Sequence, residues 1–209
     1  MDGELTRPRS GSDRGRGLVL VAAMATLMWI VEVIDQITGG ALERYGIEPH
    51  RTEGLIGIVT APFLHAGFGH LIANTIPFLV LGATIALSGL MRVVATTAIV
   101  ALVGGLGTWL LASSGTDHIG ASGVVFGYAT YLIARGLFSR NLLHLAVGVV
   151  VVGFYGASLV FGLIPADGVS WQGHLFGGAG GVVAARLLDR RANRASARDG
   201  QLAGLPELP

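Results

Sequence analysis

Six apolar segments separated by polar connections dominate this chain of 209 residues. They lie near residues 18–38, 68–88, 92–113, 121–137, 142–163 and 172–189. Each has roughly the 20 residues that a helix needs to cross the hydrocarbon core of a bilayer. Only 13% of the residues are charged, about half the fraction usual in a soluble domain. We therefore expect an all-α membrane protein whose single domain, residues 18–190, is a bundle of six transmembrane helices.

The two ends of the chain are polar, and low hydrophobicity is typical of disorder. Residues 1–17 and 191–209 are therefore expected to be disordered tails. Six spans place both tails on one side of the membrane, which then holds all but two of the fourteen arginines, Arg44 and Arg51. Basic residues concentrate on the cytoplasmic side. We expect both termini to be cytoplasmic, in a multi-pass protein of the cell's inner (plasma) membrane.

Composition also limits the chemistry. Cysteine is absent, which excludes disulfides, a cysteine nucleophile and cysteine-based zinc sites. A net charge of +1 gives no reason to expect a nucleic-acid partner. We expect no cofactor.

A serine opens the fourth apolar segment, in Gly120-Ala121-Ser122-Gly123. Small residues of this kind are common where helices pack closely, which is one explanation of the pattern. A serine in the first helical turn also lies among unpaired backbone N–H groups, at the positive end of the helix dipole. Both stabilise an oxyanion that forms beside it, so Ser122 is a candidate nucleophile.

A histidine, His174, lies in the sixth segment, as close to the external face as Ser122. Glycines spaced by four residues give both helices a face with almost no side chains. These glycines are Gly173, Gly177 and Gly181 in the sixth segment and Gly123 and Gly127 in the fourth. An isolated histidine on such a helix is most often satisfied by a backbone carbonyl. Two bare faces in contact also allow a Ser–His hydrogen bond, as nucleophilic catalysis requires.

A third polar cluster consists of His70 and Asn74, near the beginning of the second segment, and His65, just before it. His70 and Asn74 are four residues apart and so share a helix face. They can bridge helices, hold interfacial water or, together with His65, bind zinc. A metal is the weaker interpretation because His65 precedes the helix and no HExxH spacing occurs. Donation of hydrogen bonds to an oxyanion fits these side chains better.

Taken together, the three motifs resemble those of the rhomboid intramembrane serine proteases. The resemblance covers about residues 18–190 and includes His-x-x-x-Asn, Gly-x-Ser-Gly and the histidine among glycines, in that order. It implies a minimal bacterial form, a six-helix bundle with a Ser–His dyad. It also implies an active site open to the external side and substrates that are transmembrane proteins in the lipid bilayer. The sequence does not indicate an oligomeric state.

By the same resemblance, Ser122 is the nucleophile and His174 the general base. Asn74 and His70 belong to the oxyanion hole, together with the Ser122 backbone N–H. Supporting positions are His65, Phe126, Gly120 and Gly123. Phe126 stands where some members have a tyrosine that packs on the catalytic histidine, so its ring can stack on His174 but has no hydroxyl.

Two alternatives remain open at this point. A non-catalytic rhomboid-like protein would bind transmembrane clients without cutting them, although Ser122 and His174 are both present. A small transporter or channel would use intramembrane His and Asn to line a proton path. Against a transporter, the polar residues gather near one face of the membrane.

Overall fold

The computed structural model describes residues 11–139 and 141–203. This part of the chain is helical, without a strand; an isolated antiparallel bridge joins Ile47 and His118. The elements are α1 (Gly11–Ile37), η1 (Glu43–Tyr45), η2 (Glu53–Ile56), α2 (Gly57–Thr60), η3 (Ala61–Phe63), α3 (Phe68–Ala86), α4 (Leu90–Leu111), α5 (Ser122–Phe138), α6 (Leu142–Phe161) and α7 (Trp171–Ala203).

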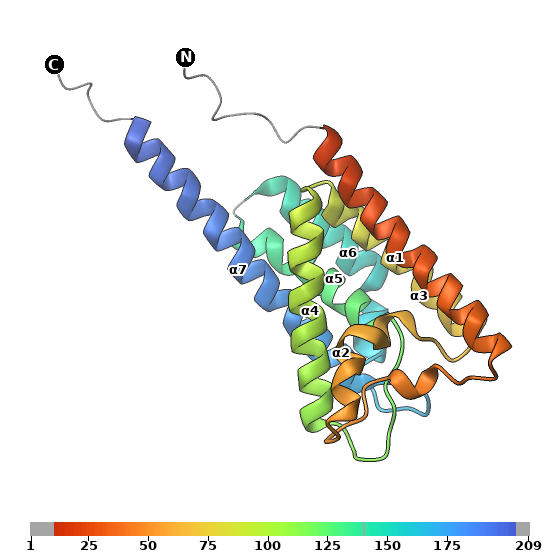
Figure 1. The fold of residues 1–209 in the computed structure, drawn as a ribbon. Coiled ribbons are helices and arrows are strands. Elements are labelled where there is room, and N and C mark those ends of the chain that lie inside the picture. Colours follow the sequence, from red (N-terminus) through yellow and green to blue (C-terminus); the bar gives the residue numbers. More distant parts are fainter. Residues whose placement is uncertain (1–10, 140, 204–209) are drawn as a thin grey trace.

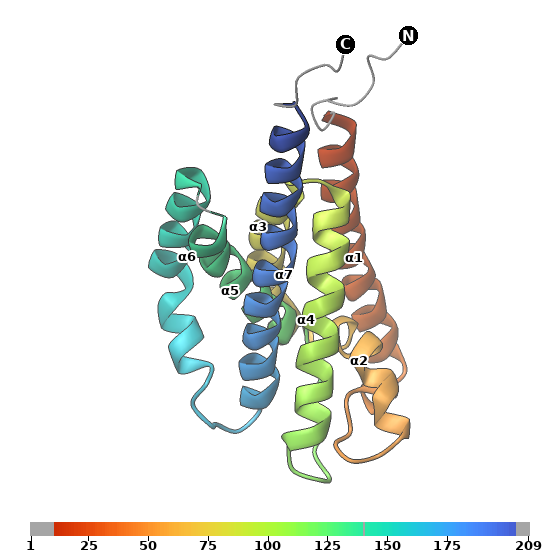
Figure 2. The ribbon, with the colours of Figure 1, turned by 90° about the vertical axis from the view of Figure 1, so that its left-hand side faces the viewer.

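The long helices run side by side, and the short helices between α1 and α3 gather at one end of the bundle (Figures 1 and 2). The beginning of α1 and the end of α7 lie at the opposite end (Figure 2). Ser122 is the first residue of α5, and His174 lies in the first turn of α7. Both helices begin at the end of the bundle that carries α2.

Helix α5 is the centre of the bundle and contacts α3, α4, α6 and α7. Most of its side chains are buried, and the Tyr128 ring stacks on Phe78 with centroids 5.6 Å apart. By contrast, α6 packs mainly against α5 and leaves apolar side chains such as Val149 and Phe154 exposed. A helix that is apolar on its outer face as well is typical of a membrane span.

Four of the described helices, α1, α3, α4 and α6, are long and apolar enough to cross a membrane. Helix α5 has only 17 residues, and the first part of α7 is rich in glycine. These are the two segments whose sequence is least apolar. The chain is therefore an all-helical, multi-pass membrane protein.

At both ends, the structure corrects the expectation of disordered tails. Helix α1 already begins at Gly11, and α7 continues to Ala203, well beyond residue 190. Gly17 packs against Ala86, and Asp13 lies in the first turn of α1, where a negative charge favours a helix. Beyond residue 190 the chain is rich in alanine and arginine, which are good helix formers. The rest of the expected tails, residues 1–10 and 204–209, lies outside the described residues.

Candidate active site

Helices α5 and α7 meet backbone to backbone through their glycines. A methyl group added at Gly177 would collide with the carbonyl of Gly123, and one at Gly181 with the carbonyl of Gly127. A methyl group at Gly123 would lie 3.1 Å from the Gly173 oxygen. The predicted contact between two bare helix faces is therefore confirmed. Because no side chain separates the two backbones, short side chains beside this seam can reach each other.

Ser122 and His174 are joined across this seam. The Ser122 Oγ atom lies 2.8 Å from Nε2 of His174, and the Nδ1 atom of His174 lies 2.7 Å from the carbonyl oxygen of Gly162. A carbonyl oxygen can only accept, so Nδ1 carries the proton and donates it to Gly162. Nε2 is then free to accept the hydroxyl proton of Ser122. This is the tautomer that a general base beside a serine needs.

The His174 ring is also held from one side by Phe126. The two rings are stacked, with centroids 4.1 Å apart and an interplanar angle of 8°. His174 is 9% exposed, so little solvent reaches the imidazole. A methyl group at Gly162 would meet the Phe126 ring and lie 3.1 Å from His174 Nδ1. Phe126 and the Gly162 carbonyl together therefore set the orientation of the imidazole without a tyrosine hydroxyl.

On the other side of Ser122, the backbone of Gly120 lies against the third polar cluster. Gly120 has a φ of +111°, a conformation that glycine adopts at low cost. A methyl group here would lie 2.7 Å from His70 Cε1 and 3.8 Å from Asn74 Nδ2. The Asn74 amide nitrogen donates to the His70 carbonyl oxygen over 3.1 Å. His70 and Asn74 thus lie beside the turn that leads into Ser122, where unpaired N–H groups begin α5.

His65 holds this turn through a hydrogen bond to its backbone. Its Nε2 atom accepts a hydrogen bond from the Ala121 backbone N–H over 3.4 Å, and its ring lies 5.1 Å from that of His70. Burial lowers the pKa of His65 to about 4, with a smaller contribution from His70, while the Phe63 backbone acts in the opposite direction. His65 is therefore neutral at pH 7, as an acceptor must be. Within residues 11–139 and 141–203, no three His, Asp or Glu side chains are placed to hold a metal ion.

Two cavities adjoin the candidate site. The smaller has a volume of about 50 Å³ and is bounded by Ser122, Gly104, Thr108 and Ile58 among others, which are mostly small or apolar. The larger, about 760 Å³, is formed by the loops at this end of the bundle and reaches His70. Charged and polar residues such as Glu43 and Asp117 line it. Water can therefore approach the site from the loops, whereas the small cavity suits a short apolar group.

Sequence reasoning missed two contributors to this arrangement. Gly162 was not a candidate because its contribution is a carbonyl at a helix end, a group that every residue has. Ser170 was also missed; its Oγ accepts from the Gly173 N–H over 3.3 Å and lies 2.7 Å from His118 Nδ1. His118 joins two loops, because its backbone N–H and carbonyl each pair with Ile47 at 3.0 Å. Burial lowers the pKa of His118, with Asp117 acting in the opposite direction.

Comparison with known proteins bears on this geometry. The model of the Rhomboid domain matches residues 52–191. An uncharacterized protein of Mycobacterium tuberculosis is 47% identical over 203 residues, which cover 92% of this chain and 84% of the relative. An uncharacterized protein of Mycobacterium leprae is 46% identical over 181 residues, covering 82% and 71%. A Bacillus subtilis protein, YdcA, with the provisional name of rhomboid protease, is 27% identical over 138 residues, covering 66% and 69%.

The matched domain contains the α5–α7 seam and all the residues that surround Ser122 and His174. The chain belongs to the rhomboid family, a family of intramembrane proteases.

Proposed function

We propose that this protein is an intramembrane serine endopeptidase that cleaves transmembrane segments of other membrane proteins. The observation that carries the proposal is the chain of contacts from Ser122 Oγ to His174 Nε2, at 2.8 Å, and from His174 Nδ1 to the Gly162 carbonyl, at 2.7 Å. A nucleophile, its base and the group that orients the base are the parts that such catalysis requires.

In the proposed reaction, His174 Nε2 removes the hydroxyl proton of Ser122 as Oγ attacks the scissile carbonyl carbon. The resulting oxyanion receives hydrogen bonds from the Ser122 backbone N–H and from the Asn74 and His70 side chains, which lie beside this turn. His174 then gives its proton to the leaving amine, and the C–N bond breaks. Water, deprotonated by His174, hydrolyses the remaining ester and restores Ser122.

We further propose that six helices cross the inner membrane, with α5 and α7 included. At about 1.5 Å per residue, the 17 residues of α5 extend about 25 Å. The distribution of arginine supports cytoplasmic termini. In that orientation Ser122 lies near the external side, and the larger cavity supplies water from that side.

Covalent labelling tests the catalytic role. The purified wild-type protein should react with a fluorophosphonate probe at one serine, which peptide mapping would identify as Ser122. The Ser122→Ala variant should lose both this labelling and the cleavage of a reporter transmembrane substrate. Ser158→Ala, at an exposed position on α6, is the matched control and should retain both.

Cleavage by the Ser122→Ala variant at the wild-type rate would disprove the assignment. A wild-type protein that captures the reporter but neither cuts it nor reacts with the probe would be a non-catalytic client-binding protein.

A further inference from the structure

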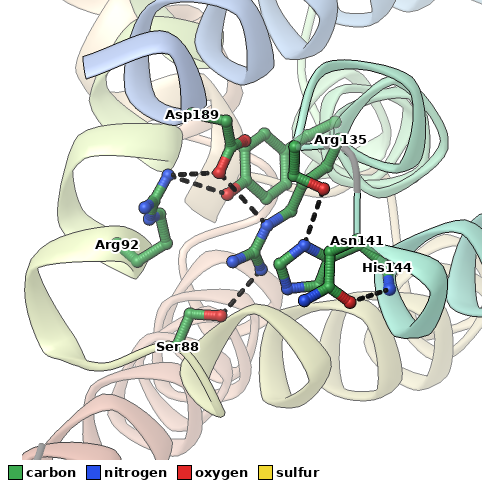
Figure 3. Close-up of polar contacts among 8 residues, drawn as sticks. Ser88, Arg92, Arg135, Asn141, His144 and Asp189 are labelled. Carbon is green, nitrogen blue, oxygen red and sulfur yellow. Dashed lines mark hydrogen bonds and ion pairs between the residues drawn. The ribbon is translucent and has the colours of Figure 1, made fainter. Parts of the chain in front are cut away.

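A buried charged cluster lies at the other end of the bundle, away from the candidate active site. Asp189 on α7 is shared by two arginines: its Oδ1 atom lies 3.1 Å from Nη1 of Arg92 on α4 and 3.4 Å from Nε of Arg135 on α5 (Figure 3). Arg135 also donates to Ser88 Oγ over 2.7 Å, in the turn between α3 and α4. Four helices are thereby connected at this end.

The charges of this cluster do not balance. Two guanidinium groups share one carboxylate, and Arg135 is 7% exposed and Asp189 3% exposed. Among the described residues, the Oδ2 atom of Asp189 is buried without a hydrogen-bond partner, and the Nε atom of Arg135 has only its 3.4 Å ion pair with Oδ1 of Asp189. A buried charge without a full complement of partners is costly. An anion close to Arg135 would supply the second negative charge that the two guanidinium groups lack.

A cavity of about 460 Å³ lies directly beside Arg135. It is bounded by α1, α5, α6 and the end of α3 with its following turn. Its polar wall contains Arg14, Ser88, Arg135 and His144, and its apolar wall includes Leu132 and Val147. His144 is held by Ser139, whose Oγ lies 2.8 Å from Nδ1, and its backbone N–H is capped by Asn141 (Figure 3).

The polar and apolar side chains of the cavity lie at different heights along the helices. Ser88 lies just beyond the end of α3, and His144 lies in the first turn of α6. Leu132 and Val147 lie about one turn further into the bundle than Arg135 and His144. The charged groups of the cavity therefore lie at the bundle end, beside Leu87 and Leu143, and the wall further into the bundle is apolar apart from Thr84. A lipid headgroup and its acyl chain would fit this arrangement.

Other nearby charges leave a positive excess. Asp13 on α1 lies against Gly89, at the beginning of α4, and does not line the cavity. Arg14, the next residue, does line it and is exposed. The three arginines Arg14, Arg92 and Arg135 carry three positive charges, and Asp13 and Asp189 carry two negative charges. The net charge is therefore +1 before any contribution from His144.

We propose that this cavity binds the phosphate group of an anionic phospholipid, with Arg14 and Arg135 facing the phosphate and the acyl chains leaving along Leu132 and Val147 toward the bilayer. A phospholipid headgroup and free inorganic phosphate would both present a phosphate anion to these arginines. The apolar wall favours the lipid because a free anion gains nothing from it. Basic pockets between helices on the cytoplasmic side are a known kind of site for anionic lipid headgroups.

Native mass spectrometry of the whole protein tests this proposal. Protein taken from nanodiscs of phosphatidylglycerol mixed with phosphatidylcholine should retain phosphatidylglycerol selectively. Arg14→Gln should lower that retention roughly fivefold, the contribution expected of one basic side chain near anionic lipid. Arg16→Gln is the matched control, since Arg16 is exposed on the same helix but does not line the cavity. His144→Gln serves as a second variant, because replacing Arg135 would also break its contact with Asp189.

Equal retention of the two lipids by the wild-type protein would overturn the proposal. So would equal loss in Arg14→Gln and Arg16→Gln. A separate arm adds inorganic phosphate to protein in pure phosphatidylcholine nanodiscs and measures the unfolding temperature. If phosphate alone raises it as much as phosphatidylglycerol does, the site binds a free anion and not a lipid.

Discussion

The carbonyl oxygen of Gly162 accepts a hydrogen bond of 2.7 Å from Nδ1 of His174, twelve residues later in the chain. The acceptor belongs to the residue that caps α6, and the donor lies in the first turn of α7. In the proposed reaction this carbonyl does what a carboxylate does in a Ser–His–Asp triad, because it keeps the proton on Nδ1. The orientation of the imidazole thus depends on where α6 ends.

Gly162→Ala should lower kcat. The added methyl group would meet the Phe126 ring and crowd His174 Nδ1, so the ring or the end of α6 must shift. A displacement of about 1 Å in catalytic geometry typically costs about a hundredfold. Gly153→Ala is the control on the same helix, because a methyl group there meets nothing within 4 Å. Equal activities of the two variants in a reporter cleavage assay would show that Gly162 does not position His174.

Gly177→Ala should destabilise the protein and separate α5 from α7. Its methyl group would collide with the backbone carbonyl of Gly123, which has no freedom to rotate away. Overpacking of this kind costs about 1–3 kcal/mol. Its neighbour Gly178 is the matched control, since a methyl group there would make an ordinary 3.4 Å contact with Thr130. The unfolding temperature and fluorophosphonate labelling should both fall in Gly177→Ala and change little in Gly178→Ala.

Stability should decrease as the pH falls below about 6.5. The pKa of His65 is about 4 in the folded protein, against an ordinary value of 6.5. Between these values the unfolded state binds more protons, so the stabilising contribution is complete above pH 6.5 and is lost as the pH falls toward 4. His65→Gln keeps an acceptor for the Ala121 N–H but does not titrate. Its unfolding temperature should therefore depend less on pH than that of the wild type; identical slopes would contradict this role.

The residue beside the scissile bond should be small. The cavity next to Ser122 has a volume of about 50 Å³, whereas a cavity that binds benzene has about 150 Å³, so it is too small for an aromatic ring. A reporter with alanine at this position should be cleaved at least about tenfold faster than one with phenylalanine. The comparison uses kcat/KM for two reporters that differ at that residue alone. Equal values would show that this cavity does not receive the substrate side chain.

The apolar segments and the glycine faces were predictable because their signals are local. A run of apolar residues indicates a helix in the membrane whatever it packs against, and glycines spaced by four fall on one helix face. The ends of α1 and α7 were not predictable from hydropathy. Their extension beyond the apolar segments rests on helix propensity and, for α1, on the contact of Gly17 with Ala86.

The sequence by itself determined an all-helical membrane protein, the pairing of α5 with α7 and the choice of Ser122 and His174 as candidates, because composition and periodicity carry that information. Only the tertiary structure decided how His174 is held and which charges gather around Arg135. Both depend on groups distant in the chain, the Gly162 carbonyl and the carboxylate of Asp189. A backbone carbonyl is the same in every residue, and an ion pair needs two positions at once, so neither can be recognised before the helices are packed.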